Sequence, residues 1–299
     1  MKNLQPVIKW SGSKRSQARA IVSLVSGRYG TYYESFCGGC SVLYYILNNR
    51  PELFRRYVCN DINEPLIELY RLIVSDHRRV WKSYTELWHG LNDGKGAGDL
   101  DKKKEYFYKV RDEFNRTHSP ELFFFIMRTT TNGMPRYNAD GDFNNSFHFT
   151  RDGITPDGAL EVLEEWSRTL NRHNVEFRSG SYDRISPESD DFVYFDPPYY
   201  GSTAVYNEKN GWTYAQEKKL AEIADTLDGK GISFAISNNL KYGNQILDEL
   251  CERYTAIHLG SKYNNSSYHK KDKEASDDEV LVVNYIPDIH SHEKKRVLF

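Results

Sequence analysis

The tetrapeptide Asp196-Pro197-Pro198-Tyr199 combines a carboxylate, a rigid turn and an aromatic ring. It directly follows the apolar run 192–195, which has the length and composition of a buried strand. Two prolines cannot continue a helix or a central strand, so the chain leaves the sheet there in a stiff turn. The carboxylate and the ring then lie at the carboxyl end of a strand, where open α/β sheets bind ligands. A carboxylate and backbone carbonyls can accept hydrogen bonds from an amino group, and a tyrosine ring can stack on a flat base. Together these groups indicate chemistry on the exocyclic amine of a nucleobase.

A second group of residues has the pattern of an adenosine-binding site. The strand pattern 31–36 runs into Gly38-Gly39 and then into an apolar helix, which is how a Rossmann-like unit begins. About twenty residues later a short strand ends in Asp61, and an acid at this spacing commonly binds the ribose hydroxyls of an adenosine-containing cofactor. The alternative for Asp61 is a helix N-cap in front of Pro65.

The remaining elements continue the alternation of strand and helix, with one interruption. After residue 156 the patterns predict helices over 156–171, 214–227 and 243–252 and strands over 175–177, 192–195, 231–237, 255–259 and 280–285. Residues 65–130 have helical periodicity instead. The sequence therefore predicts an α/β fold, in which residues 1–64 and 156–299 form a Rossmann-like catalytic domain and residues 65–155 form an inserted helical and hairpin domain.

Two polar segments have the composition of a nucleic-acid contact. Residues 133–152 are rich in Asn, Gly, Phe and Arg, with a hairpin turn predicted at Asp140-Gly141. Such side chains on a hairpin suit base edges and phosphates, although an ordinary polar loop has the same composition. The Lys-rich segment 261–278 is predicted to be a loop that could bind a nucleic-acid backbone, with a solvated loop as the alternative.

Composition restricts the class of protein. The chain has 299 residues and a net charge of −2, so nucleic-acid binding must come from locally clustered Lys and Arg. No apolar stretch approaches the roughly 20 residues that span a bilayer, and the N-terminus has no apolar signal core, so we expect a cytoplasmic protein. The four cysteines do not form a disulfide framework, and we expect Cys37 and Cys40 to flank a glycine turn rather than bind zinc.

Six short segments, in their order along the chain, resemble the motifs of the phage-like α group (D12 class) of Dam-type DNA adenine-N6 methyltransferases. The resemblance extends from Lys9 to about Tyr285. The segments that show it are 9–14 (KWSGSK), 34–41 (ESFCGGCS), 60–63 (NDIN), 136–144 (RYNADGDFN), 196–199 (DPPY) and 236–238 (ISN).

The resemblance implies an S-adenosylmethionine-dependent enzyme that flips an adenine out of duplex DNA and methylates its N6. The residues that it assigns to catalysis are Asp196, Pro197, Pro198 and Tyr199. The residues that it assigns to the cofactor are Trp10, Lys14, Phe36, Gly38, Gly39, Cys40, Asp61, Ile62, Asp183 and Asp196. The residues that it assigns to DNA are Lys14, Arg136, Asn138, Phe143, Asn144, Arg151 and Asn238. It implies no metal, a monomer or weak dimer, and the cytoplasm of a bacterial or phage-infected cell, with restriction-modification among the possible roles.

Several departures and alternatives stay open at this point. Ser146-Phe147-His148 stands where many relatives have a PFG element, which leaves recognition of GATC open. A cytosine-N4 or RNA methyltransferase and an inactive nucleic-acid-binding relative are alternatives, but aspartate at the head of the tetrapeptide favours adenine over cytosine. A Rossmann oxidoreductase is disfavoured because the glycine loop lacks a GxGxxG pattern.

Overall fold

The apolar runs form a single sheet in the computed structural model, which describes residues 5–92, 98–150, 152–202, 211–259 and 278–288. Within these residues the sheet has seven strands in the order β3-β2-β1-β4-β5-β7-β6. The strands are β1 (Tyr29–Glu34), β2 (Phe54–Asp61), β3 (Val175–Ser179), β4 (Phe192–Phe195), β5 (Ser233–Asn239), β6 (Thr255–His258) and β7 (Glu279–Val283). Neighbouring strands are parallel, except that β7 runs antiparallel to both β5 and β6.

The centre of the sheet creates the crevice in which a ligand can bind. Strand β1 pairs with β2 on one side and with β4 on the other, so the order of the strands reverses between β1 and β4. The loops that follow these two strands therefore turn to opposite faces and leave a gap at the carboxyl edge. Both the glycine turn after β1 and the Asp-Pro-Pro-Tyr turn after β4 lie at this edge.

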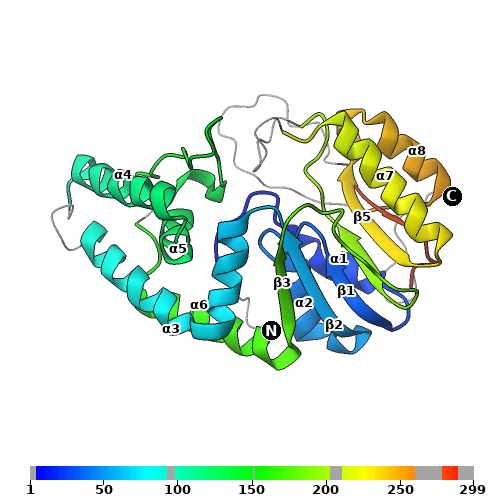
Figure 1. The fold of residues 1–299 in the computed structure, drawn as a ribbon, viewed down its shortest axis with the longest axis horizontal. Coiled ribbons are helices and arrows are strands. Elements are labelled where there is room, and N and C mark those ends of the chain that lie inside the picture. Colours follow the sequence, from blue (N-terminus) through cyan, green and yellow to red (C-terminus); the bar gives the residue numbers. More distant parts are fainter. Residues whose placement is uncertain (1–4, 93–97, 151, 203–210, 260–277, 289–299) are drawn as a thin grey trace.

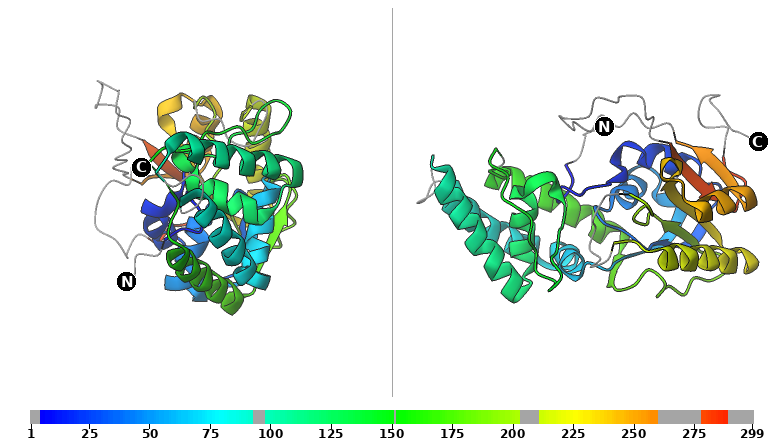
Figure 2. Two further views of the ribbon diagram at one scale, coloured as in Figure 1. Left: turned by 90° about the vertical axis from the view of Figure 1, so that its left-hand side faces the viewer. Right: turned by 90° about the horizontal axis from the view of Figure 1, so that it is seen from above.

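Helices cover both faces of the sheet (Figure 1, Figure 2). The described helices are α1 (Ala18–Ser23), α2 (Ser41–Asn49), α3 (Glu64–Asn92), α4 (Leu100–Thr117), α5 (Pro120–Thr129), α6 (Pro156–His173), α7 (Tyr214–Gly229) and α8 (Gln245–Arg253). Of these, α4 and α5 pack on α3 rather than on the sheet. Adjacent strand residues point to opposite faces: Tyr32 packs in the core with α1, α2 and α6, whereas Tyr33 packs in the core with α7 and α8. Strands β1, β4, β5 and β7 are buried on both faces, which explains their nearly continuous apolar runs.

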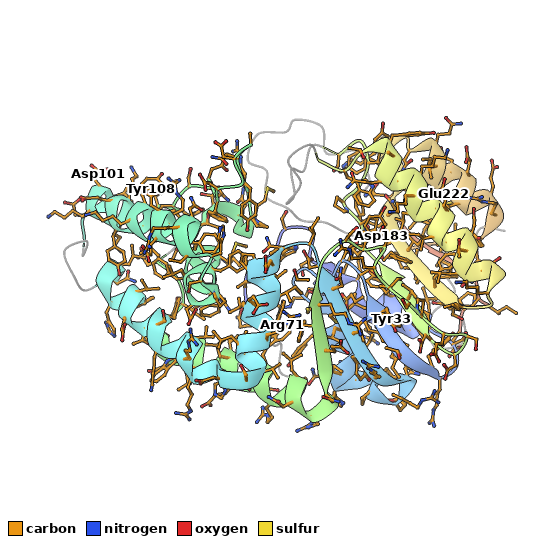
Figure 3. The ribbon with its side chains drawn as sticks, in the orientation of Figure 1. Tyr33, Arg71, Asp101, Tyr108, Asp183 and Glu222 are labelled. Atoms are coloured by element: carbon orange, nitrogen blue, oxygen red, sulfur yellow. The ribbon has the colours of Figure 1, made fainter. Side chains whose placement is uncertain are left out.

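Helix α3 connects the sheet to a helical part at the other end of the molecule (Figure 1). Its first half lies against β3, where Tyr70 stacks on Phe177 with ring centroids 5.0 Å apart and the guanidinium of Arg71 donates to the Phe177 carbonyl (Figure 3). The helix then kinks at Asp76, which has non-helical angles of φ −155° and ψ 72°. Beyond the kink, Tyr84 and its neighbours pack against α5.

The observed elements differ from the predicted ones mainly at their ends. The last strand stops at Val283 rather than at residue 285, because the side-chain oxygen of Asn284 accepts the Phe234 N–H at 2.8 Å in place of a backbone carbonyl. Strand β5 begins at Ser233 because Gly231, with φ +68°, lies in the turn after α7.

Two predicted features fall outside the described residues: Arg151, and the Lys-rich segment 261–278 apart from Asp278. Among the described helices, none is long and apolar enough to cross a membrane. The described part of the chain also has no group of three or more His, Cys, Asp or Glu side chains arranged to hold a metal ion.

Candidate active site

A pocket opens at the carboxyl edge of the sheet, where the strand order reverses. Loops after β1, β2, β3, β4 and β5, the first residue of β7 and the N-terminal segment line it. The predicted site residues among its lining are Trp10, Lys14, Phe36, Gly38, Gly39, Asp61, Ile62, Asp196, Pro197, Pro198 and Tyr199. The fold thus gathers one cavity from segments that are far apart in the sequence.

The N-terminal segment closes one side of this pocket against the glycine turn. Gly38 has φ +43°, and a Cβ atom there would lie 2.6 Å from Nε1 of Trp10. A side chain at this position would displace the indole, so only glycine allows the segment to pack so closely. The short 3-10 helix Lys14–Ser16 follows, and the Lys14 side chain points into the pocket with only 5% of it exposed.

Lys14 forms a buried ion pair with the carboxylate of the Asp-Pro-Pro-Tyr turn. Its Nζ lies 2.8 Å from Oδ1 of Asp196, whose side chain is 17% exposed. Burial raises the pKa of Asp196 to about 6, while the Lys14 ammonium opposes this shift. Asp196 is therefore mostly ionised at neutral pH and is a hydrogen-bond acceptor.

Tyr199 is fixed at both its ring and its hydroxyl. The hydroxyl donates to Oε2 of Glu279 at 2.7 Å, and Nζ of Lys14 lies 5.0 Å from the centre of the ring. Burial and the neighbouring carboxylates of Asp196 and Glu279 raise the pKa of Tyr199 well above its usual value. The phenol consequently stays protonated and serves as a donor to Glu279.

Asp61 holds the glycine turn and keeps acceptor capacity. Its Oδ2 accepts the Gly38 N–H at 2.9 Å, and its Oδ1 accepts the Asn63 N–H at 2.9 Å. Burial raises the pKa of Asp61 to about 6, although these two backbone N–H groups lower it. The alternative helix-capping role belongs to Asn63, whose side chain accepts the Leu66 N–H at 3.0 Å.

Aromatic and apolar side chains line the part of the pocket beside Asp61. Phe36 stacks on Tyr182 with ring centroids 5.0 Å apart, and Trp212 packs edge-on against Phe36. Ile62 also lines the pocket while 53% of it stays exposed. The buried Ser35 hydroxyl has no hydrogen-bond partner among the described residues. This surface suits a flat, partly polar group such as an adenosine.

Comparison with known proteins identifies the family. The profile of the D12 class N6 adenine-specific DNA methyltransferases matches residues 10–265. The chain belongs to this family. Membership confirms the family, the α/β methyltransferase fold class and the enzyme class predicted from the sequence.

Individual relatives agree with this assignment. The chain is 27% identical over 300 residues to the type II methyltransferase M.MjaIII of Methanocaldococcus jannaschii, covering 94% of this chain and 99% of that one. It is 31% identical over 250 residues to the DNA adenine methylase of Escherichia coli K12, covering 80% and 82%. It is 28% identical over 288 residues to the type II methyltransferase M.FokI of Planomicrobium okeanokoites, where the match covers 93% of this chain but only 42% of the relative.

A solved structure gives a much weaker match. The rRNA methyltransferase aviRa from Streptomyces viridochromogenes aligns at a TM-score of 0.30 and 12% identity, over 90% of this chain and 81% of that one. A score this low supports no conclusion about this methyltransferase.

Two residues predicted to bind the cofactor do not line the pocket of this methyltransferase. The thiol of Cys40 is fully buried and faces Cys37, Cys59 and Tyr70, because Cys40 is the left-handed N-cap of α2 and its side chain turns into the core. Asp183 (labelled in Figure 3) follows β3, and its carboxylate pairs with Lys219 of α7 instead.

Asn238, predicted to bind DNA, also points away from the pocket. It is 2% exposed and donates to Glu217 of α7, whereas the next residue, Asn239, lines the pocket. Side chains alternate along a strand, so of these two adjacent asparagines it is Asn239 that faces the pocket.

The predicted recognition segment forms a hairpin, but only some of its side chains are exposed. Tyr137 and Phe143 bridge across the turn, and Asn144 N–H donates to the Arg136 carbonyl at 2.8 Å. Arg136 is exposed. Phe143, also predicted to bind DNA, is 1% exposed because it packs against Phe114 of α4, so it belongs to the core that supports the hairpin.

The two asparagines of the hairpin have different environments. The Asn138 side-chain oxygen accepts the N–H groups of Asp140 and Asp142, so its oxygen holds the turn. The side-chain oxygen of Asn144 is buried and has no hydrogen-bond partner among the described residues.

Three residues of interest were not predicted from the sequence. Glu279 and Asn239 line the pocket, and Phe149, which stacks on His148, is 66% exposed just beyond the hairpin. The alternation of side chains along β5 could have identified Asn239 as a pocket-lining residue. The acid at the start of the last strand was visible in the sequence, but nothing local showed that β7 lies beside β5.

Proposed function

We propose that this chain transfers a methyl group from S-adenosylmethionine to N6 of an adenine flipped out of duplex DNA. One observation supports the proposal above all: Asp196 and Tyr199 share a single pocket with Asp61 and the turn at Gly38. A donor of the methyl group and the amine that accepts it must meet in such a cavity. Family membership supplies the reaction class.

The residues beside Asp61 fit the cofactor. Each carboxylate oxygen of Asp61 accepts a hydrogen bond from one backbone N–H. Each oxygen therefore has a further acceptor site for a ribose hydroxyl. Phe36 and Ile62 offer apolar surface for an adenine ring, and the buried Ser35 hydroxyl still needs a partner. The turn at Gly38 and the segment that contains Trp10 would hold the methionine end. When bound, the cofactor supplies a sulfonium methyl group that an amine can attack.

The remaining half of the pocket fits the target amine. Asp196 would accept a hydrogen bond from N6, and Tyr199 would stack on the base. Together they orient the nitrogen lone pair toward the methyl group, so that catalysis comes mainly from positioning. In the structure Lys14 contacts the same carboxylate and the same ring, so its ammonium borders the space that the base would enter.

The hairpin and the helical part would bind the duplex. Exposed Arg136 can contact phosphate or a base edge, and exposed Phe149 can pack against a base or a sugar. We keep the division into a catalytic domain, residues 1–64 and 156–299, and an inserted recognition domain, residues 65–155. Helix α3 is shared between the two, since its first half packs on the sheet.

Methyl transfer from tritiated S-adenosylmethionine tests the proposal directly. Unmethylated plasmid DNA and total RNA serve as alternative substrates, and digestion to nucleosides identifies the labelled base. We expect N6-methyladenine in DNA alone, and none with Asp196→Ala. Label on cytosine or in RNA would refute the adenine-DNA proposal. Equal binding of S-adenosylmethionine and NAD in calorimetry would refute the cofactor assignment.

A further inference from the structure

Glu279 lies in the pocket on a strand that no motif marks. It is 5% exposed, begins β7 and lines the cavity. The antiparallel register places it opposite Asn239 of β5, and its carbonyl accepts the Leu259 N–H at 2.9 Å. Its backbone is therefore held on both sides, by β5 and by the residue after β6.

The carboxylate of Glu279 receives two neutral donors. Its Oε2 accepts the Tyr199 hydroxyl at 2.7 Å, and its Oε1 accepts Nδ2 of Asn239 at 3.3 Å. Among the described residues no lysine, arginine or histidine forms an ion pair with it. Glutamine could accept only one of these donors and would turn its own amide N–H toward the other. The two converging donors therefore require a carboxylate, although burying that charge is costly.

The contact with Tyr199 fixes the ring at the atom farthest from its backbone. A hydroxyl held there keeps the side chain from swinging about its Cα–Cβ bond, so the ring stays in the place where a base can stack. A hydrogen bond to an anion is also stronger than one to a neutral acceptor, and it draws electron density toward the ring. The ring already attracts a cation, because the Lys14 ammonium lies 5.0 Å from its centre.

We propose that Glu279 is a positioning residue for methyl transfer, which holds the Tyr199 ring against the target base. Through the same hydrogen bond it strengthens the attraction of the ring for the positive charge that develops on the amine as the methyl group arrives. This inference rests on the proposed function, since it assigns to Tyr199 the base-stacking role. Glu279 itself touches neither the methyl group nor the amine.

Four variants test the inference: Tyr199→Phe, which keeps the ring without its hydroxyl, Glu279→Ala, Glu279→Gln and the double variant Tyr199→Phe/Glu279→Ala. Single-turnover transfer from tritiated S-adenosylmethionine to unmethylated plasmid DNA gives the rate at the active site. Calorimetry gives the cofactor affinity and the fraction of active sites. Glu222→Gln is the matched control, since Glu222 is exposed on α7 (Figure 3).

We expect Tyr199→Phe and Glu279→Ala each to lower the transfer rate about tenfold, the effect of losing a hydrogen bond to a charged group. The double variant should be no slower than either single variant, because both changes remove the same contact. Glu279→Gln should retain part of the rate, and cofactor affinity should stay within about threefold in all four.

Other results would overturn the inference. If the rate losses of the two single variants multiply in the double variant, Glu279 does not act through Tyr199. Unchanged transfer rates in both Glu279 variants would show the same. A merely structural role would reduce the fraction of active sites and the melting temperature while the rate per site stayed unchanged. If the wild-type protein transfers no more label than Asp196→Ala does, the proposed function itself fails, which is a distinguishable result.

Discussion

Replacement of Lys14 by methionine should shift the pH dependence of methyl transfer. The ammonium of Lys14 and the carboxylate of Asp196 are 2.8 Å apart, with side chains only 5% and 17% exposed. Burial raises the pKa of Asp196 to about 6 even with this cation present. Lys14→Met leaves the burial and removes the opposing charge, so the pKa of Asp196 must rise further.

The size of the effect follows from the distance. At an effective dielectric constant of about 20, two unit charges at this separation attract by roughly 6 kcal/mol before desolvation is subtracted. A cation this close lowers the pKa of a carboxyl group by about 1 to 3 in practice. The acid limb of the pH–rate profile should therefore move upward by roughly 1 to 3 pH units. Ionised Asp196 accepts the amine, so activity near pH 7 should fall about tenfold and recover toward pH 9.

The assay is single-turnover transfer at saturating S-adenosylmethionine between pH 5 and 9.5. Lys14→Arg keeps the charge, so its acid limb should stay near that of the wild-type protein. Lys218→Met, on the exposed face of α7, controls for loss of a lysine elsewhere. An unchanged midpoint in Lys14→Met, with a rate lowered equally at every pH, would refute the electrostatic reasoning.

Three further predictions concern the cofactor and DNA contacts. Asp61→Asn should weaken S-adenosylmethionine binding about tenfold or more in calorimetry, since hydrogen bonds to a charged group are lost, and unchanged affinity would remove Asp61 from the cofactor site. Asp183→Asn should leave that affinity within about twofold, because the wild-type carboxylate pairs with Lys219, and a larger loss would restore its predicted role. Arg136→Ala should weaken DNA binding and reduce the slope of log affinity against log salt by about 1, and an unchanged slope would place this exposed residue outside the interface.

Local patterns were sufficient to predict most of the fold. The run 192–195 is a strand buried on both faces, and the two prolines end it where the tetrapeptide begins. The glycine turn follows β1 and Asp61 ends β2, as expected. Periodicity, turn residues and buried apolar runs depend on neighbours in the sequence, so they can be recognised without tertiary structure.

Contacts between distant segments could not be predicted in this way. The pairing of Lys14 with Asp196 and of Tyr199 with Glu279 depends on the order of the strands. Phe143 lies in a polar segment, yet Phe114 of α4 buries it.

Two further assignments depend on contacts of the same kind. The family resemblance assigns Asp183 to the cofactor, whereas in the structure its carboxylate pairs with Lys219 of α7, a contact between segments far apart in the sequence. Asn238 and Asn239 are neighbours on β5, so their side chains point to opposite sides of the strand. The sequence alone does not say which of the two faces the pocket.

Long-read sequencing of DNA from a methylation-deficient host that expresses this chain tests the central claim most directly. The control is the same host with Asp196→Ala, checked for soluble protein that still binds S-adenosylmethionine. We predict N6-methyladenine within one short sequence motif, absent in the control. A motif other than GATC would assign the changed residues after the hairpin to specificity. The absence of modified adenine in DNA from soluble, cofactor-binding wild-type protein would contradict the account.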